Sequence, residues 1–119
     1  MREGPIVKKT IDFSVSVFKY SRILEGKRQF IFSNQLLRSG TSIGANVFEA
    51  QYAESIIDFI HKMKIALKEA NETLYWLTLC EKVDEHEVDQ DMFVRLNEII
   101  TILSRIIITS KRNLNESAN

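Results

Sequence analysis

The sequence predicts an all-α protein that folds as an antiparallel up-down-up-down four-helix bundle. The chain of 119 residues has one proline and four glycines, and so few helix breakers favour long helices. Its apolar residues recur at helical spacing in four segments. The connectors between these segments are short, so neighbouring helices should run antiparallel. At this length we expect a single domain over residues 1–119.

The first helix is expected over residues 5–25. Pro5 suits the first turn of a helix, and Gly26 is expected to end it. The helix has more than one apolar face, because its apolar residues fall in two stripes. One stripe contains Val7, Ile11 and Phe18, and the other contains Phe13, Val17, Tyr20 and Leu24.

The second helix is expected over residues 29–52. Gly40 and Gly44 lie one turn apart in it, so a neighbouring backbone should approach this helix closely, at a cost of about 1 kcal/mol per Gly relative to Ala. The apolar side of the helix consists of Phe32, Leu36, Gly40, Ile43 and Val47.

The third helix, expected over residues 54–83, shows the clearest repeat. Its apolar residues alternate in steps of four and three, which is typical of a bundle seam. That seam consists of Ile56, Ile60, Met63, Leu67, Ala70, Leu74 and Leu77.

An acidic connector follows, and after it a fourth helix is expected over residues 89–113. The acids of the connector, at positions 84, 85, 87, 89 and 91, favour the N-terminus of a helix, and Lys111 and Arg112 suit its C-terminal end. Residues 114–119 are expected to form a frayed tail. The seam of this helix consists of Phe93, Leu96, Ile100, Leu103 and Ile107.

Apolar residues remain outside the seams of the first, third and fourth helices. Trp76 is among them, and tryptophan is enriched at protein interfaces. We therefore predict a homo-oligomer that buries these second faces. The alternative is a monomer with scattered apolar surface residues, which are common. The predicted interface consists of Ile65, Trp76, Leu79, Ile99, Ile102, Ile106 and Ile108.

The charge and cysteine content exclude several classes of protein. Sixteen basic residues balance 16 acidic ones, so any binding of nucleic acid must depend on local charge. Cys80 is the single cysteine and can form no internal disulfide. The N-terminus lacks the apolar core of a signal peptide, and no apolar run approaches the ~18 residues of a membrane span. We expect a soluble cytoplasmic protein without a membrane partner.

The residues that could carry out catalysis lack the context that catalysis requires. Residues 40–44, GTSIG, have the letter pattern of a nucleophile elbow around Ser42, but an elbow needs a strand before it, and the preceding residues show no strand alternation. Asp58 and His61 have a spacing related to that of di-metal bundle sites, but the second pair such a site needs is missing. No phosphate-binding glycine loop is present. We therefore predict no catalytic, cofactor-binding or metal site.

A stripe of polar residues runs along the second helix, and Arg38 borders it. Its members advance by four, three, four and three residues, so they share one side of the helix. The stripe has two interpretations: a set of hydrogen bonds to a neighbouring helix or subunit that fixes the register, or a contact strip for a ligand or RNA. Its members are Gln35, Ser39, Ser42, Asn46 and Glu49.

Positive charge is predicted to gather at one end of the bundle. In the expected topology both chain ends lie together, which would bring Lys8 and Lys9 close to Lys111 and Arg112. In a symmetric oligomer such a cluster repeats around the axis. The alternative is a solvated end whose charges match the helix dipoles.

Two blocks of the sequence resemble a known family. The first comprises Gln35 to Ser39, Ser42-Ile43 and Asn46 to Ala50, and the second is IALKEANETLYWL, residues 65–77. In this order and spacing they resemble the four-helix-bundle family encoded in intervening sequences of bacterial large-subunit ribosomal RNA genes. By this resemblance the polar stripe, Arg38 and Glu72 are motif positions.

The resemblance implies an antiparallel four-helix bundle that assembles as a ring, such as a pentamer. Proteins related to this family include the accessory subunit of diversity-generating retroelements, a basic ring that binds nucleic acid and a reverse transcriptase. This chain differs from that subunit in its zero net charge. Two functions therefore stand: an oligomeric bundle that binds structured RNA through its basic end, or a scaffold that binds a protein partner.

Overall fold

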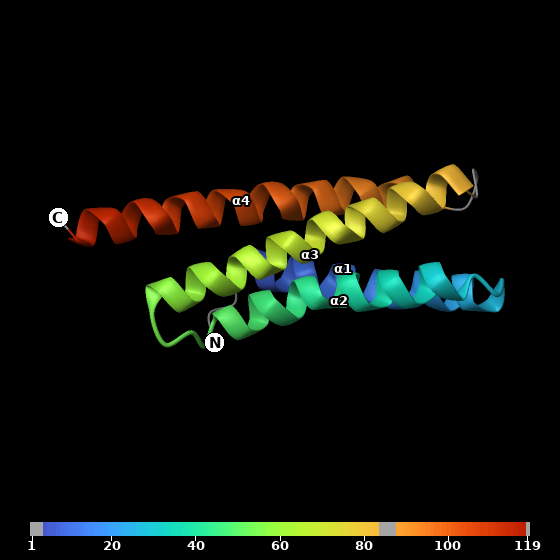
Figure 1. The fold of residues 1–119 in the computed structure, drawn as a ribbon, viewed down its shortest axis with the longest axis horizontal. Coiled ribbons are helices and arrows are strands. Elements are labelled where there is room, and N and C mark those ends of the chain that lie inside the picture. The colour runs from blue at the N-terminus through green and yellow to red at the C-terminus, as the bar shows by residue number, and fades with distance from the viewer. Residues whose placement is uncertain (1–3, 84–87, 119) are drawn as a thin grey trace.

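Four helices make up the computed structural model, which describes residues 4–83 and 88–118. They are α1 (Pro5–Gly26), α2 (Phe30–Ala50), α3 (Ile56–Val83) and α4 (Gln90–Ala118). Figure 1 shows them running alternately in opposite directions along the molecule. No strand occurs in the described ranges. The predicted all-α antiparallel bundle is confirmed. Three acids of the predicted connector, Asp84, Glu85 and Glu87, lie outside the described residues.

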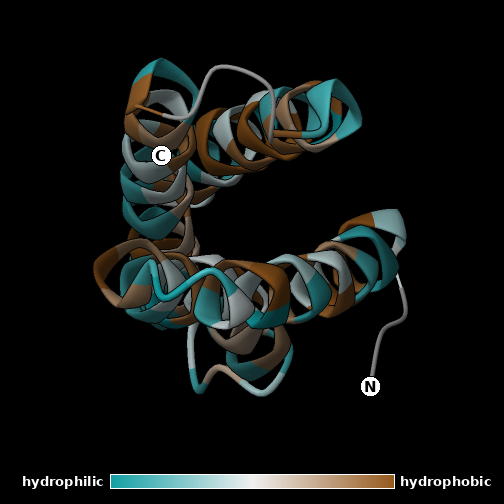
Figure 2. Cartoon of the chain, turned by 90° about the vertical axis from the view of Figure 1, so that its right-hand side faces the viewer, coloured by the Kyte–Doolittle hydropathy of each residue, from teal (hydrophilic) through white to brown (hydrophobic). Residues whose placement is uncertain are grey.

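The helices pack mainly in chain order. The contacts of α2 with α1 and with α3 are extensive, α3 also packs on α4, and the contact between α1 and α4 is the smallest of the four. The molecule is elongated, 55 × 23 × 21 Å. Seen along this length, the helices are arranged around an arc (Figure 2).

The contact between α1 and α2 is close because α2 presents glycines to α1. A Cβ atom at Gly40 would lie 2.7 Å from Cγ1 of Val17, and one at Gly44 would lie 3.2 Å from the carbonyl oxygen of Thr10. The predicted close approach of a neighbouring backbone is confirmed. Larger side chains fill the core around this contact, among them Phe13, Leu24, Leu36, Ile43, Met63, Leu77, Leu96 and Leu103.

The predicted seams of α3 and α4 are partly wrong. In α4, Met92 and Ile99 are buried, whereas Phe93 and Ile100 are only half-buried. Apolar residues occupy more than one side of this helix, so its contacts with α3 and α1 decide which side faces the core. In α3, the predicted Ile56, Leu67 and Leu74 lie at the edge of the core or outside it, and the small residues Ala66 and Thr73 are buried instead.

The turn between α1 and α2 differs from the prediction. Gly26 belongs to α1, and the residue with left-handed backbone is Arg28, with φ of 61°. The amide of Gln29 donates to the carbonyl of Leu24 and that of Arg28 to Glu25, each at 2.9 Å. This pair of hydrogen bonds is a Schellman motif, in which Arg28 occupies the position usually taken by glycine.

The ends of α3 and α4 also depart from the expected bounds. Ser55 caps α3, because its Oγ accepts a hydrogen bond of 3.0 Å from the amide of Asp58. The helix α4 continues to Ala118, so the predicted fraying from residue 114 is wrong. The segment 113–118 contains no proline or glycine that would stop the helix.

Candidate functional surfaces

The polar stripe of α2 forms most of its hydrogen bonds within the bundle. Ser39 is fully buried; its Oγ donates to the carbonyl of Gln35 at 2.8 Å and accepts from Oγ1 of Thr73, on α3, at 3.0 Å. Asn46 donates to the carbonyl of Ser42 at 2.8 Å. Gln35 is half-buried, and Glu49 at the end of the stripe is exposed. Among the hydrogen bonds of the stripe, the one between Ser39 and Thr73 links α2 to α3, and those of Ser42 and Asn46 return to carbonyls of α2 itself.

Ser42 lies in the middle of α2, and its Oγ donates to the carbonyl of Arg38 at 2.6 Å. A nucleophile elbow instead places its serine in a strained turn between a strand and a helix. The GTSIG segment therefore has no elbow geometry, and its glycines serve the contact with α1.

Arg38 connects the motif residues of the two helices. Its guanidinium donates to Oε2 of Glu69 at 3.3 Å and pairs with Glu72. Glu72 also accepts a hydrogen bond of 3.4 Å from Nε1 of Trp76. The indole of Trp76 packs edge-on against Phe32, with ring centroids 6.4 Å apart. A network of charge and aromatic rings thus joins α2 to α3 at the surface.

A second buried link joins α1 to α2 and was not predicted from the sequence. Ser21 donates to the carbonyl of Ser33 at 2.9 Å, and Ser33 donates to the carbonyl of Ser21 at 3.0 Å. Both residues are buried. They fall on the core side of their helices at apolar spacing, and this position was the one signal in the sequence that could have identified them.

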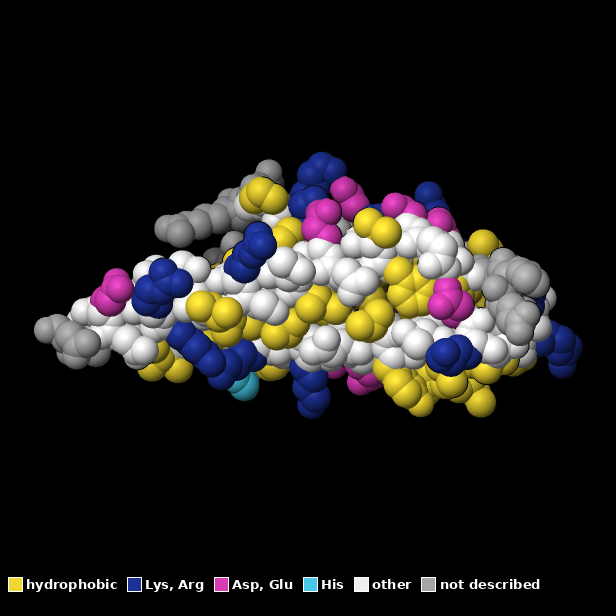
Figure 3. Space-filling view, turned by 90° about the horizontal axis from the view of Figure 1, so that it is seen from above, with side chains coloured by type: hydrophobic (Ala, Val, Ile, Leu, Met, Phe, Trp, Pro, Cys, Tyr) yellow, Lys and Arg dark blue, Asp and Glu magenta, His cyan; other side chains and the backbone are white. Residues whose placement is uncertain are grey.

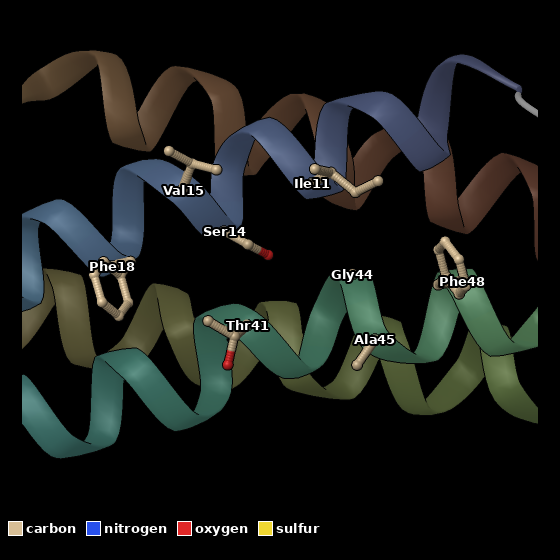
Figure 4. Close-up of a pocket in the computed structure, with 8 residues that line it drawn as sticks. All are labelled: Ile11, Ser14, Val15, Phe18, Thr41, Gly44, Ala45 and Phe48. Atoms are coloured by element: carbon tan, nitrogen blue, oxygen red, sulfur yellow. The ribbon is translucent and has the colours of Figure 1, made fainter.

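An open apolar groove of about 510 Å³ runs between α1 and α2. Figure 4 shows the residues that line it along the two helices. Val15 and Phe18 are each 49% exposed. Polar atoms come only from small side chains, so the groove offers little for a charged ligand. Its eight residues are Ile11, Ser14, Val15, Phe18, Thr41, Gly44, Ala45 and Phe48.

The predicted basic end does not form, because α1 begins level with the middle of α4. Lys9 pairs with Glu98, and Nζ of Lys8 lies 2.7 Å from Asp12. This hydrogen bond to Lys8 lowers the pKa of the Asp12 carboxyl below its ordinary value. Lys111 is 13 positions beyond Glu98 in α4, which is about 20 Å along a helix. The structure separates Lys8 and Lys9 from Lys111 and Arg112.

Cations gather instead where the first half of α3 lies beside the last third of α4. The Lys64 amine is within hydrogen-bonding reach of Lys111, and this contact, together with charge repulsion, lowers the pKa of Lys111. Figure 3 shows dark-blue Lys and Arg side chains beside the cyan histidine at this end of the molecule. We call this surface the cationic face; it consists of His61, Lys64, Lys68, Lys111 and Arg112, all exposed.

The cationic face lacks neutralising partners. Among the described residues, the ion pairs of α3 involve Asp58, Lys62, Glu69 and Glu72, and none involves Lys64 or Lys68. Since α3 has 3.6 residues per turn, His61, Lys64 and Lys68 share its outer side. This side is therefore a concentrated positive surface on a chain of zero net charge.

The residues of the predicted oligomer interface have different environments. Ile99 is 1% exposed and belongs to the core, so its prediction as an interface residue is wrong. Its side of α4 faces the bundle because the buried face of that helix is rotated from the predicted one. Ile108 is 59% exposed. The others, Ile65, Trp76, Leu79, Ile102 and Ile106, are half-buried.

The other side chains considered as metal ligands are those of Cys80, Asp58 and His61. Cys80 is fully buried, with Sγ 3.4 Å from the hydroxyl oxygen of Tyr20. The carboxylate of Asp58 accepts a hydrogen bond of 3.2 Å from the amide of Glu54 and lies 3.7 Å from Nζ of Lys62, while His61 is exposed. Within residues 4–83 and 88–118, no cluster of three or more His, Cys, Asp or Glu side chains could hold a metal ion. In the same ranges, no helix has both the length and the apolar character needed to cross a membrane.

Comparison with known proteins places this bundle in a family. The family model of the 23S rRNA-intervening sequence protein matches residues 2–109. A solved structure from Bacteroides thetaiotaomicron VPI-5482, a protein with unknown function from the S23 ribosomal protein family, is similar at 40% identity with a TM-score of 0.79. The match covers 86% of this chain and 97% of that chain. No curated protein sequence matches.

These two matches confirm the resemblance inferred from the blocks around Arg38 and Trp76. Neither description names an enzymatic activity. The chain belongs to the 23S rRNA-intervening sequence protein family.

Proposed function

We propose that this protein is a non-enzymatic, homo-oligomeric helical bundle that binds structured RNA through its cationic face. The observation that carries the proposal is the group of exposed cations on α3 and α4, in which Lys64 and Lys68 have no acidic partner among the described residues. Lys64 and Lys111 lie close together although like charges repel. A polyanion removes that repulsion when it binds both amines.

The chemistry of these side chains suits the phosphates of a nucleic-acid backbone better than a single small anion. Lysine amines on long flexible stems act as point charges toward phosphate, and their binding to RNA gains free energy from the release of counterions. Ribosomal RNA is the first ligand to test, because the family is named for the intervening sequences of 23S rRNA.

Self-assembly is the second part of the proposal and is supported by the apolar groove. A contiguous apolar surface on a soluble protein is typical of an interaction site. In a ring the cationic face would repeat around the axis, which raises the local positive potential that each RNA molecule meets. A pentamer or a similar ring is the expected assembly.

Charge reversal tests the RNA-binding part. We expect Lys64→Glu together with Lys68→Glu to lower the affinity for a folded ribosomal RNA fragment at least about tenfold. The slope of log K against log salt should fall by about 2, one for each lost phosphate contact. Fluorescence anisotropy over a salt series measures both quantities.

The matched control reverses Lys8 and Lys9, which removes the same number of charges from a surface where both amines have acidic partners. This control should bind RNA nearly as the wild type does. Equal losses in both double variants would contradict the assignment of the cationic face, and no RNA binding by the wild type even at low salt would end the proposal.

A protein-binding scaffold is the alternative function, and the apolar groove is the observation that favours it. Phe18→Ser combined with Phe48→Ser makes the groove polar at its two ends. If the groove holds a second copy, light scattering should report a smaller assembly for this variant. If it holds a different protein, the mass of the purified variant is unchanged, and a partner that survives nuclease treatment of the wild type is lost.

A further inference from the structure

The outer side of α3 continues beyond its cations to an exposed aromatic ring. Positions 61, 64, 68, 71 and 75 advance by three or four residues and fall on one side of the helix; all five side chains, including Tyr75, are exposed. We propose that this side binds a single-stranded segment of the structured RNA, with Lys64 and Lys68 on the phosphates and Tyr75 stacked on an unpaired base. The proposal deepens the function proposed above and rests on it.

The spacing along α3 suits an extended strand. Lys64 and Lys68 are one turn apart, about 6 Å along the axis, and Tyr75 lies about 10 Å beyond Lys68. The first distance is comparable with the separation of neighbouring phosphates in an RNA strand. The second leaves room for a small number of nucleotides between the last lysine and the ring.

The ring of Tyr75 is exposed and also held in place. Its exposed fraction is 58%, which leaves ring surface open for stacking. Its centroid lies 5.1 Å from that of Trp76 in an edge contact. Trp76 is fixed in turn by Phe32 and by its hydrogen bond to Glu72. A ring held by such a support loses little conformational freedom when a base stacks on it.

The nearest acid does not block this track. Glu72 lies at the edge of the outer side of α3, between Lys68 and Tyr75 in sequence. Its carboxylate pairs with Arg38, on α2, and accepts a hydrogen bond from Trp76, so it is directed towards α2. The same guanidinium also pairs with Glu69 and offsets part of the charge of the two acids. Asn71, between the lysines and Tyr75, adds an amide that can donate to a base or to a phosphate.

Tyr75 allows this side of α3 to discriminate between single strands and duplexes. In an A-form duplex the bases are already paired and stacked, so a side chain on a helix surface cannot stack on them. A duplex can meet the two lysines but gains nothing from Tyr75. An unpaired base gains stacking energy on an aromatic ring, whatever its identity.

The test compares a labelled oligouridine with an RNA duplex of the same strand length, using the full chain. Tyr75→Ala should weaken binding of the oligouridine about tenfold and leave the affinity for the duplex unchanged. Tyr75→Phe, which keeps the ring, should bind as the wild type does. Tyr52→Ala is the matched control, because Tyr52 is similarly exposed, at 63%, but lies outside α3.

Trp76 supplies a second readout that reports contact directly. It is the single tryptophan of the chain and touches the ring of Tyr75. Oligouridine should therefore change its emission in the wild type and in Tyr75→Phe. Circular dichroism confirms that each variant is folded.

The outcomes distinguish this inference from the function on which it rests. Equal oligouridine affinities for the wild type and Tyr75→Ala would overturn the stacking role of Tyr75. Parallel losses for oligouridine and duplex would overturn the preference for single strands. Absence of binding to either RNA would overturn the proposed function itself.

Discussion

The helix α1 meets its two neighbours through opposite kinds of contact. Against α2 it packs through small residues, with Val17 over Gly40 and Ser21 bonded to Ser33 in the buried interior. Against α4 its surface contacts use long polar side chains: Lys9 pairs with Glu98, and Nη1 of Arg95 donates to Oγ of Ser16 at 2.7 Å. The first contact tolerates almost no change in volume, whereas the second can rearrange.

This difference indicates which of the two helix contacts can be substituted without displacing the neighbouring helix. The pair α1–α2 is a unit fixed by steric fit, and it presents the apolar groove on its outer side. The side chains of the α1–α4 contact are partly solvated, so salt and charge substitutions act on it directly. Substitutions in the two contacts should therefore cause losses of stability that differ in size and in salt dependence.

The largest effect is expected from Gly40→Ala. The new Cβ would come within 2.8 Å of both methyl groups of Val17, whose β-branched side chain has little freedom to turn away. We expect a net loss of about 2 kcal/mol, after the gain in helix propensity offsets part of the overpacking. Denaturant unfolding measures it.

Gly26→Ala is the control for that substitution, since no heavy atom lies within 4 Å of the position of its Cβ. It should leave stability unchanged or raise it by up to about 1 kcal/mol. A Gly40→Ala protein as stable as the wild type would show that α1 and α2 separate easily, contrary to the steric account.

The next largest loss of stability is expected from substitution of the two buried serines, Ser21 and Ser33. Ser21→Ala removes a buried donor from the link to α2, and we expect a loss of about 1.5 kcal/mol. Ser33→Ala should behave similarly. The double variant should lose less than the sum, because the two side chains belong to one contact, in which their hydroxyl oxygens lie 2.8 Å apart. Additive losses in the double-mutant cycle would mean that the two hydroxyls act independently.

A change in the opposite direction is expected at the α1–α2 turn. Arg28→Gly relieves the left-handed backbone at φ 61° and should stabilise the fold by about 1 kcal/mol. Thermal unfolding should show a higher Tm. A lower Tm would indicate that the Arg28 side chain contributes more than its backbone strain costs.

The smallest effect is expected at the α1–α4 contact. Lys9→Ala removes an ion pair whose two side chains are both about half exposed, so the loss should be about 0.5 kcal/mol or less. It should shrink further as salt is added. Urea unfolding at low and high salt checks this, and a loss comparable with that of Gly40→Ala would erase the contrast between the two contacts.

The fold was predictable because four long apolar repeats and few helix breakers leave one architecture. The close approach at Gly40 and Gly44 also followed from residue size. The turn did not, since α1 includes Gly26 and ends in hydrogen bonds to Leu24 and Glu25 that place Arg28 in the left-handed region. Such hydrogen bonds depend on the residue at which the helix ends, and the pattern of side chains does not reveal that residue.

The candidate surfaces were harder to predict because they depend on the relative positions of the helices. The stripe around Ser39 was evident from spacing alone, and Thr73 opposite it was not. The proximity of Lys64 and Lys111 follows from the register of α3 and α4. The same register places Lys9 beside Glu98 and so divides the expected basic end.

We propose that the chain works as an assembly that carries RNA. Purification without nuclease, with mass from light scattering and the ultraviolet absorbance ratio recorded together, tests it most directly. We expect a particle several times the 13.8 kDa of one chain, with the excess absorbance of bound nucleic acid, and we expect this excess to be lost in Lys64→Glu/Lys68→Glu. A folded particle of one chain with the absorbance of protein alone would contradict it.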